Sequence, residues 1–176
     1  RMSMASMTEE DLKTWVEMGQ PEGSLEKGER EMIYSIFQFG DTLTREIMVP
    51  RIDVLALDTE STLGEAREMF VKGGHSRVPV YEDTVDNVVG LLYAKDLLSL
   101  QQDDDLIAHH RDLLRLAYFV PESKKVDEVL AEMQTRNMHM AIVVDEYGGV
   151  AGVVTLEDIV EEIVGEIRDE YDESEE

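Results

Sequence analysis

The sequence has 176 residues, 43% of them hydrophobic, which is enough for one ordinary domain or two small, tightly packed ones with a real core. Forty acidic against 16 basic residues give a formal net charge of −24, which argues against binding to nucleic acid or to an anionic lipid surface. The absence of cysteine excludes disulfides and thiolate metal sites.

The first part of the chain predicts a helical lead-in rather than a membrane or targeting segment. Residues 8–18 and 31–39 have helical patterns, separated by the breaker QPEGS. No run approaches the roughly 20 apolar residues that a membrane-spanning helix needs, and the leader RMSMASM lacks the apolar core of a signal peptide. Because the chain begins with Arg1, we expect it to be a fragment that carries vector residues. Membrane segments could then belong to the parent protein.

The middle of the chain contains an internal repeat, with residues 61–98 matching residues 124–160. Val80 falls on Val143 at an offset of 63, and Gly90 falls on Gly152 at an offset of 62. One residue has therefore been lost in the turn between two strands.

Each copy predicts the same order of elements: an amphipathic helix, a short strand, a polar turn, a second strand and a second helix. The predicted strands are residues 77–81 and 88–93 in the first copy and 140–144 and 150–155 in the second, each copy being preceded by a further strand at 54–57 or 116–120. One unit is too small to bury both faces of its sheet. We therefore expect an α/β (α+β) fold of two β-α-β-β-α units, packed sheet to sheet with pseudo-two-fold symmetry behind short N-terminal helices.

These patterns divide the chain into four expected parts: lead-in and vector residues 1–43, first repeat 44–106, second repeat 107–168 and acidic tail 169–176. The final residues, RDEYDESEE, have no apolar period, so they predict a solvated, mobile tail.

The stretch VAGVVTLEDIVEE (150–162) is the strongest candidate for chemistry, and it has two interpretations. Thr155 followed by Asp158 resembles a helix cap, in which the hydroxyl binds a backbone N–H and the acid complements the helix dipole. The same hydroxyl, carboxylate and N–H groups also suit a ligand site at a helix N-terminus. The two roles are compatible.

The repeat and its motifs resemble a tandem cystathionine-β-synthase-type (CBS) pair, or Bateman module. More narrowly, the chain resembles the CorC/HlyC group of bacterial magnesium and cobalt transport proteins, which are related to the animal CNNM proteins. The resemblance spans about residues 8–172 and depends on IMVPRIDV (47–54), GHSRVPVY (74–81), AKDLL (94–98), VDEYGGVAGVVTLEDIVEEIVGEI (144–167) and DEYD (169–172).

The resemblance implies a regulatory module that binds an adenine nucleotide, ATP with Mg²⁺ or AMP, and that forms a homodimer through its CBS pairs. It also implies a membrane transport domain in the full-length protein, which would place this segment on the cytoplasmic side of the membrane. In the implied nucleotide site, Asp158 accepts hydrogen bonds from the ribose hydroxyls, Thr155 donates one, and Arg51 is a further phosphate contact. The site consists of Ile52, Asp53, Val54, His75, Ser76, Arg77, Pro79, Val153, Thr155 and Asp158.

The first copy departs from the pattern, because Tyr93 stands where Thr155 stands in the second copy and the opposing residues 138–141 include no Arg. We therefore expect one occupied site per chain and a degenerate second cleft, with a weak site at Lys95 and Asp96 as an alternative. Arg77 also fits a simple ion pair with a surface acid, and His75 and His139 fit ordinary packed or half-exposed residues. We expect the adjacent His109 and His110 to face solvent, because neighbouring residues do not face each other on a helix.

Two other functions remain as alternatives. A structural dimerisation module without a ligand is consistent with the degenerate first copy. An enzyme such as a metal-dependent phosphohydrolase is disfavoured, because the sequence offers no His/Asp cluster at ligand spacing, no Gly-rich phosphate loop and no nucleophile paired with a base. We predict no metal site in the protein itself and no catalysis.

Overall fold

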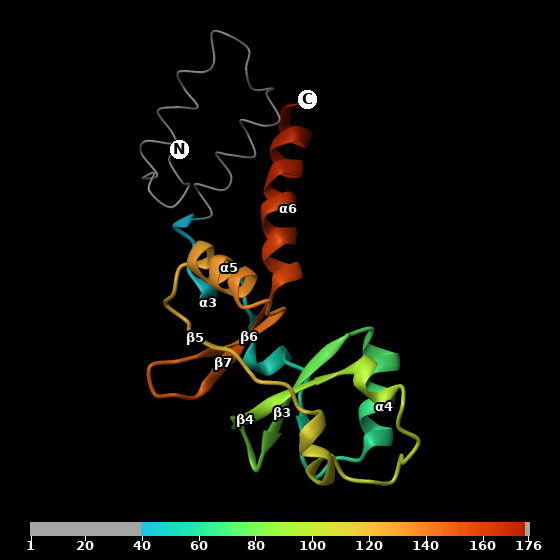
Figure 1. The fold of residues 1–176 in the computed structure, drawn as a ribbon. Helices are drawn as coiled ribbons and strands as arrows, with labels where there is room; N and C mark the ends of the chain where they lie inside the picture. Colours follow the sequence, from blue (N-terminus) through green and yellow to red (C-terminus); the bar gives the residue numbers. More distant parts are fainter. Residues whose placement is uncertain (1–39, 175–176) are drawn as a thin grey trace, which may run out of the picture.

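A computed structural model of the chain describes residues 40–174, so the predicted lead-in helices lie outside the described residues. The described residues form two halves that lie side by side, and a long C-terminal helix extends away from them (Figure 1). The first half contains β2 (Leu57–Asp58), α4 (Leu63–Gly73), β3 (Arg77–Glu82), β4 (Thr84–Tyr93) and the 3₁₀ segments η4 (Ala94–Leu97) and η5 (Ile107–Leu113). The second half contains α3 (Thr44–Ile47), β1 (Val49–Pro50), η3 (Arg51–Asp53), β5 (Phe119–Pro121), α5 (Val126–Thr135), β6 (Met140–Val144), β7 (Val150–Thr155) and α6 (Leu156–Ser174).

The two repeats exchange the segments at their N-terminal ends. The sheets have the orders β1-β7-β6-β5 and β2-β3-β4. Strand β1 lies in the first part of the first repeat but pairs with β7 of the second, with Val49 opposite Val153. Arg115 lies in the first part of the second repeat but bridges to Leu91 in β4 of the first. This reciprocal exchange confirms the predicted two-repeat fold with pseudo-two-fold symmetry.

The matched glycines lie where these exchanged segments approach most closely. A Cβ at Gly152 would lie 2.2 Å from the carbonyl oxygen of Val49, and a Cβ at Gly90 would lie 2.9 Å from the Cβ of Leu114. Gly90 pairs with Val80 and Gly152 pairs with Val143, and both hairpins shift register next to these pairs. The structure therefore confirms the sequence alignment of the repeats and gives a steric reason for both glycines.

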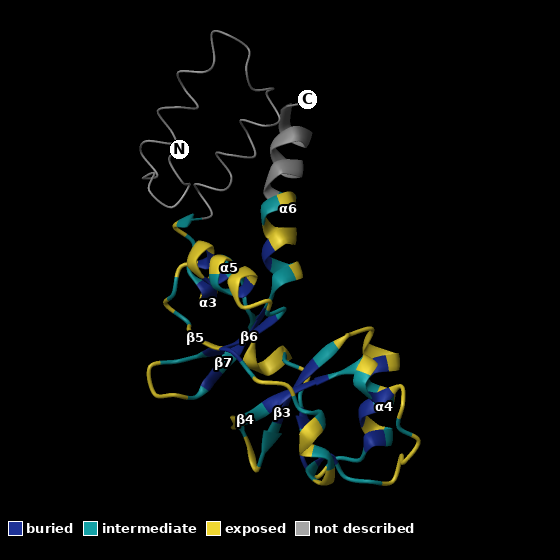
Figure 2. Ribbon diagram, viewed as in Figure 1, coloured by how far each residue is buried: buried dark blue, intermediate teal, exposed yellow. Residues whose placement is uncertain are grey.

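The buried side chains of the described residues show that the sheets pack face to face. One cluster lies between α4 and the first sheet, and another lies among α5, α6 and the second sheet. A third joins Leu91 of β4 to Met140 and Ile142 of β6 and Val150 and Val153 of β7. Figure 2 shows the buried strands at the centre, with exposed residues on the outer faces of the helices. The expected sheet-to-sheet core is confirmed.

Several element boundaries differ from the sequence prediction. The predicted polar turn EDTVDN is mostly strand, because Asp83 takes a left-handed conformation (φ 67°) and β4 already begins at Thr84. The predicted second helix of the first copy is only the 3₁₀ segment η4, whose N-cap residue Tyr93 makes no side-chain cap. By contrast, α6 has a hydroxyl cap and continues to Ser174, past the expected boundary at residue 168, with no proline to stop it.

The early strands and one histidine also differ. Strands β2 and β5 are short and begin three residues later than predicted, at Leu57 and Phe119. His110 is part-buried rather than solvent-facing, because its Nε2 lies 3.0 Å from the carboxylate of Asp105. In the part of the chain that the structure describes, no helix is both long and apolar enough to span a bilayer.

Candidate functional site

The first cavity has a volume of about 370 Å³ and lies where β3, the segment after η3 and the start of α6 meet. Both repeats contribute to its walls. Nine of the ten residues that the sequence predicted for one site line it, namely Asp53, Val54, His75, Ser76, Arg77, Pro79, Val153, Thr155 and Asp158. Segments far apart in the sequence therefore bring the predicted side chains together.

The start of α6 is positioned by a helix cap. Strand β7 ends at Thr155, whose Oγ1 accepts a hydrogen bond of 3.0 Å from the backbone N–H of Asp158. The Leu156 N–H donates to the carbonyl of His139 at 2.9 Å, which ties the helix start to the neighbouring strand segment. The cap uses a lone pair of the hydroxyl and leaves its O–H proton free to donate. Capping and ligand binding are thus compatible at Thr155.

Arg77 is the one Lys or Arg among the described residues that line the first cavity, which also has three acids, Asp53, Glu157 and Asp158. Its Nη1 lies 3.2 Å from Oε1 of Glu157, so the ion pair that the sequence left as an alternative is present. Its guanidinium carbon lies 5.3 Å from the centre of the Tyr93 ring. Its Nε is buried and has no hydrogen-bond partner among residues 40–174.

Two predicted residues lie outside this cavity. The side chain of Ile52 is 91% exposed. Arg51 donates to the carboxylate of Asp86 and, at 3.3 Å, to the carbonyl of Val150. The N–H of Val150 and the Arg51 guanidinium hold the pKa of Asp86 below its ordinary value. Arg51 is therefore engaged in a contact between the repeats, and its role at a phosphate stays a prediction.

Sequence reasoning missed six lining residues: Val49, Leu55, Gly74, Val78, Met140 and Glu157. Glu157 stands between Thr155 and Asp158, so its position in the motif was an available signal. Val49 and Met140 reach the cavity only because β1 and β6 lie on either side of β7, a neighbourhood that the linear pattern does not reveal.

A second cavity, of about 500 Å³, is the counterpart formed around the first copy of the motif. Tyr93 lines it in the place that Thr155 takes in the first cavity. Both oxygens of Asp96, the counterpart of Asp158, accept hydrogen bonds of 2.9 Å from Arg115. This fork lowers the pKa of Asp96 and raises the pKa of Arg115. The motif is degenerate as a sequence, but the cavity itself is open.

The basic lining of the second cavity was missed at the sequence level. The opposing residues 138–141 indeed supply no Arg, but Arg77 enters from the wall shared with the first cavity and Arg115 enters on the exchanged segment. Among the described residues, no three His, Asp or Glu side chains gather closely enough to hold a metal ion.

Comparison with known proteins identifies the fold. The model of the CBS domain matches residues 45–103 and 107–165. The chain belongs to the CBS domain family. The solved CBS domain of a bacterial CNNM/CorC family Mg²⁺ transporter is 44% identical, covers 90% of this chain and 97% of its own, and superposes with a TM-score of 0.77. The chain is therefore a tandem CBS pair of the CNNM/CorC type.

Similar structures include two nucleotide complexes. The CBS domain of the bacterial CNNM/CorC family Mg²⁺ transporter in complex with ATP is 45% identical, with a TM-score of 0.71 over 78% of this chain and 97% of that one. A CBS-domain pair from Klebsiella pneumoniae with bound AMP is 28% identical, with a TM-score of 0.60 over 70% and 99%.

The curated relatives are longer proteins. A UPF0053 protein of Mycobacterium tuberculosis is 44% identical over 171 residues, which are 96% of this CBS pair and 39% of the relative. The magnesium and cobalt efflux protein CorC of Salmonella typhimurium is 44% identical over 149 residues, 85% of this CBS pair and 51% of the relative. The CBS pair thus spans about half the length of these relatives or less.

Proposed function

We propose that this CBS pair binds an adenine nucleotide, ATP with Mg²⁺ or AMP, in the first cavity, and that it regulates a magnesium and cobalt transport protein. The observation that carries the proposal is the convergence of nine predicted residues on one cavity at the start of α6. The ATP and AMP complexes of similar CBS structures support the ligand class.

The ribose end of the ligand belongs at the start of α6. The Asp158 carboxylate is suited to accept the protons of two ribose hydroxyls, and Thr155 has an O–H proton that the helix cap does not use. The helix N-terminus favours negative charge nearby, which suits the first phosphate of a nucleotide. This proposal gives the TLED motif a second role besides capping.

The adenine ring belongs against the apolar part of the lining. Val54, Pro79 and Val153, all predicted, and Met140, which was not, supply this surface. Most small-molecule pockets combine such apolar walls with a few polar groups that fix orientation. Backbone groups of the strands next to them can read the edge of the base.

The phosphates face an unfavourable balance of charge. Three acids and one arginine line the first cavity, in a chain with a net charge of −24. A triphosphate therefore needs a bound Mg²⁺ to reduce its charge, whereas AMP needs this less. We propose Mg–ATP and AMP as the alternative forms of the ligand, with Mg²⁺ held by the nucleotide.

Regulation follows if the nucleotide prefers one arrangement of the repeats or of two chains. Both repeats line the first cavity, so a ligand there contacts the two halves at once. On α6, Ile159 is fully buried, while Val160 and Val164 are 48% and 39% exposed. We propose that this exposed pair forms part of a homodimer contact. From the transport relatives we also infer that the full-length protein has a membrane transport domain and that the CBS pair lies on the cytoplasmic side of the membrane.

The second candidate function is a structural dimerisation module without a ligand. The observation that favours it is the Thr155 cap, because the hydroxyl has a structural role even without a nucleotide. We favour a non-catalytic role in both cases, since no residue among those described is placed as an activated nucleophile.

Calorimetry distinguishes the two functions. ATP and AMP would be titrated into the wild type, Thr155→Ile and Thr155→Ser, each with and without Mg²⁺. Saturable binding near one per chain, lost in Thr155→Ile and largely kept in Thr155→Ser, would support the proposal, because serine keeps the hydroxyl. No heat from any nucleotide on folded wild type would leave the motif as a helix cap and favour the structural module.

A further inference from the structure

The second cavity has the opposite charge from the first. Its described lining includes three Lys or Arg side chains and one His, and no Asp or Glu. The basic lining residues are Arg77, Lys95, Arg115 and His139, and the others are Ser76, Tyr93, Ala94, Leu98 and Asn137. The whole chain has only 16 Lys and Arg against 40 Asp and Glu. A gathering of cations in one hollow of so acidic a protein indicates a site for an anion.

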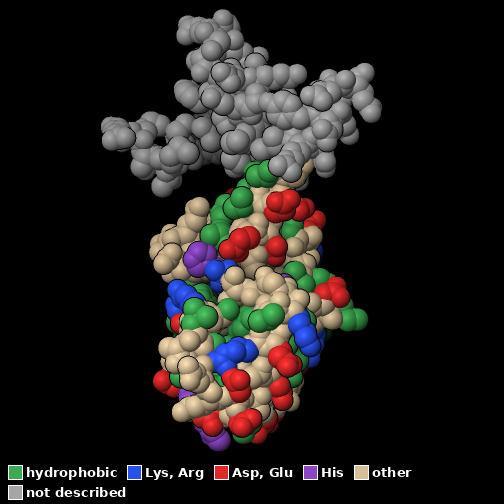
Figure 3. Space-filling model, turned by 90° about the vertical axis from the view of Figure 1, so that its right-hand side faces the viewer, with side chains coloured by type: hydrophobic (Ala, Val, Ile, Leu, Met, Phe, Trp, Pro, Cys, Tyr) green, Lys and Arg blue, Asp and Glu red, His purple; other side chains and the backbone are tan. Residues whose placement is uncertain are grey.

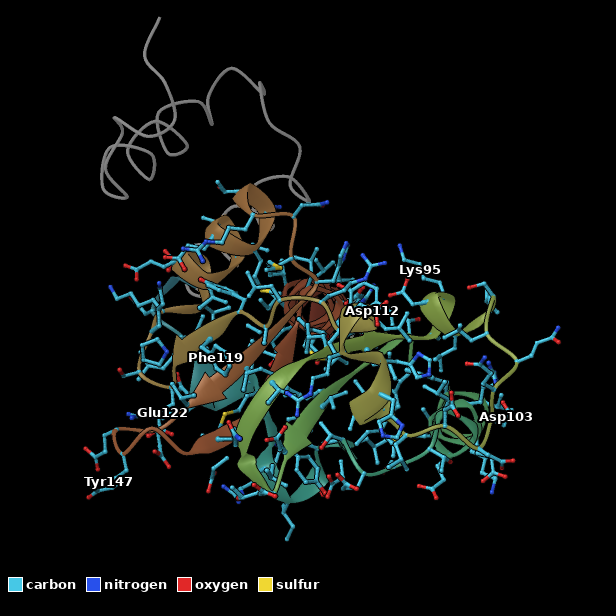
Figure 4. All side chains as sticks on the ribbon, turned by 60° about the horizontal axis from the view of Figure 1, so that its bottom comes forward. Lys95, Asp103, Asp112, Phe119, Glu122 and Tyr147 are labelled. Atoms are coloured by element: carbon cyan, nitrogen blue, oxygen red, sulfur yellow. The ribbon has the colours of Figure 1, made fainter. Side chains whose placement is uncertain are left out.

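These cations are held around one aromatic ring. The guanidinium carbons of Arg115 and Arg77 lie 4.2 and 5.3 Å from the centre of the Tyr93 ring, and Nζ of Lys95 lies 5.7 Å from it. Cations within about 6 Å of a ring face are attracted to its electrons. Arg115 is fixed further by its fork on Asp96. Lys95 lies on η4, and Figure 4 shows its side chain projecting outward.

Two buried nitrogens of the lining lack partners. Arg77 Nε and His139 Nδ1 are buried, and neither has a hydrogen-bond partner among residues 40–174. Leaving a buried polar atom without a partner destabilises the fold. Both atoms have almost no accessible surface, so a ligand reaches them only if their side chains shift toward the cavity. A ligand with several acceptor oxygens would favour that shift, because it would supply the acceptor that Arg77 Nε lacks and, with the suitable tautomer, the one that His139 Nδ1 lacks.

A nucleotide is a poor match for this second cavity. The carboxylate of Asp96, which would bind ribose hydroxyls, already has both oxygens on Arg115. Tyr93 replaces the small hydroxyl donor, and cations occupy the neighbourhood of its ring, where a base would otherwise stack. The ligand that remains is one with concentrated negative charge and no nucleoside.

We propose that the second cavity binds a compact, multiply charged oxyanion, of the pyrophosphate or polycarboxylate type, at a site separate from that of the nucleotide in the first cavity. Arg115 and Lys95 provide its charge-assisted contacts at the rim, and Arg77 provides one from the wall shared with the first cavity. His139, which lines the second cavity alone, provides a hydrogen bond. The first cavity, with its three acids, repels the same anion.

The test uses charge changes of opposite sign in the same pair. Inorganic pyrophosphate would be titrated calorimetrically, without Mg²⁺, into wild type, Arg115→Gln and Asp96→Asn. We expect saturable binding near one per chain, weakened about tenfold by Arg115→Gln and strengthened severalfold by Asp96→Asn, because charge-assisted contacts dominate such sites. A merely structural fork would weaken binding in both variants. Circular dichroism would verify that each variant remains folded.

Two further variants serve as controls. Lys72→Gln removes one positive charge from the exposed surface of α4, so it lowers the net charge as Arg115→Gln does and should leave pyrophosphate binding unchanged. Thr155→Ile disables the first cavity and should also leave it unchanged, which separates this proposal from nucleotide binding. No saturable binding to wild type, equal weakening by Asp96→Asn and Arg115→Gln, or loss of binding in Thr155→Ile would overturn the proposal.

Discussion

Replacing Glu157 with Gln should reduce the dependence of ATP binding on Mg²⁺. Glu157 lines the first cavity, and its Oε1 lies 3.2 Å from Nη1 of Arg77, the one Lys or Arg among the described lining residues. A phosphate that binds this guanidinium must therefore approach the same carboxylate. The substitution Glu157→Gln would keep the shape of the side chain and remove the repulsion.

The size of the effect follows from the geometry. Two groups that hydrogen-bond to one guanidinium lie about 5 Å apart, and two unit charges at that distance interact by about 1 kcal/mol at an effective dielectric constant of about 60. We choose a value close to water because the Glu157 side chain is 61% exposed. One kcal/mol corresponds to about a fivefold change in the dissociation constant. The ion pair itself is partly exposed, so its loss contributes little.

The assay is calorimetric titration of ATP and AMP with and without Mg²⁺. For Glu157→Gln we expect metal-free ATP to bind about fivefold more tightly, and Mg–ATP and AMP to change less because each carries a smaller net charge than metal-free ATP. Glu162→Gln is the matched control, since Glu162 is exposed on α6 and does not line the cavity. Equal effects of the two variants, or weaker metal-free ATP binding in Glu157→Gln, would refute the electrostatic reasoning.

Two further predictions concern stability. Gly152→Ala should destabilise the fold by about 3 kcal/mol or more in urea unfolding, because its Cβ would lie 2.2 Å from the Val49 carbonyl oxygen. Gly165→Ala should instead stabilise α6 by about 0.5–1 kcal/mol, because no heavy atom lies within 4 Å of the added Cβ. Equal effects of the two glycine variants would contradict the close approach of β1 and β7. Asp86→Asn should lower the urea midpoint at pH 7, and this difference should shrink as the pH falls below the ordinary aspartate pKa of about 4 and vanish below the lowered pKa of the folded state. The sign follows because the pKa of Asp86 is lowered in the folded state, so its charge stabilises only above the ordinary pKa of an aspartate; a midpoint difference independent of pH would contradict it.

The surface charge is consistent with the acidic composition. Figure 3 shows acidic side chains spread over one face, with a few basic groups among them. Tyr147 projects from the tip of the β6–β7 hairpin (Figure 4), is 88% exposed and lines neither cavity. The basic lining of the second cavity is therefore a local feature that the net charge of the chain conceals.

The repeat made much of the fold predictable. Periodicity and the match of Val80 with Val143 predicted β6 and β7 with their observed bounds and the packing of two sheets. The lining of the first cavity was predictable because the resemblance to CBS pairs implies which positions of each copy bind the nucleotide. Glu157 was within reach of the same reasoning, since it lies inside the quoted motif.

The remainder depended on contacts that no local pattern encodes. The exchange of segments places Arg115 beside Leu91, although 24 positions separate them in the chain. The predicted second helix of the first copy is only the 3₁₀ segment η4, because Tyr93 offers no side-chain cap. Tyr93 stands in place of the threonine of the second copy, and this same difference predicted a degenerate site. A motif comparison detects what the first copy has lost, but it cannot detect an arginine supplied from outside the motif.

The two cavities therefore differ for a physical reason that duplication alone would not produce. Val49 takes in the first cavity the place that Arg115 takes in the second, because each lies in the first part of a repeat and pairs with the last strand of the other repeat. An apolar residue there leaves Asp158 available, whereas an arginine occupies both oxygens of Asp96. Ser76 and Arg77 line both cavities, so ligands in the two sites share one wall. Because binding free energies are linked, any effect of an anion on nucleotide affinity through Arg77 must be matched by an equal effect of the nucleotide on the anion.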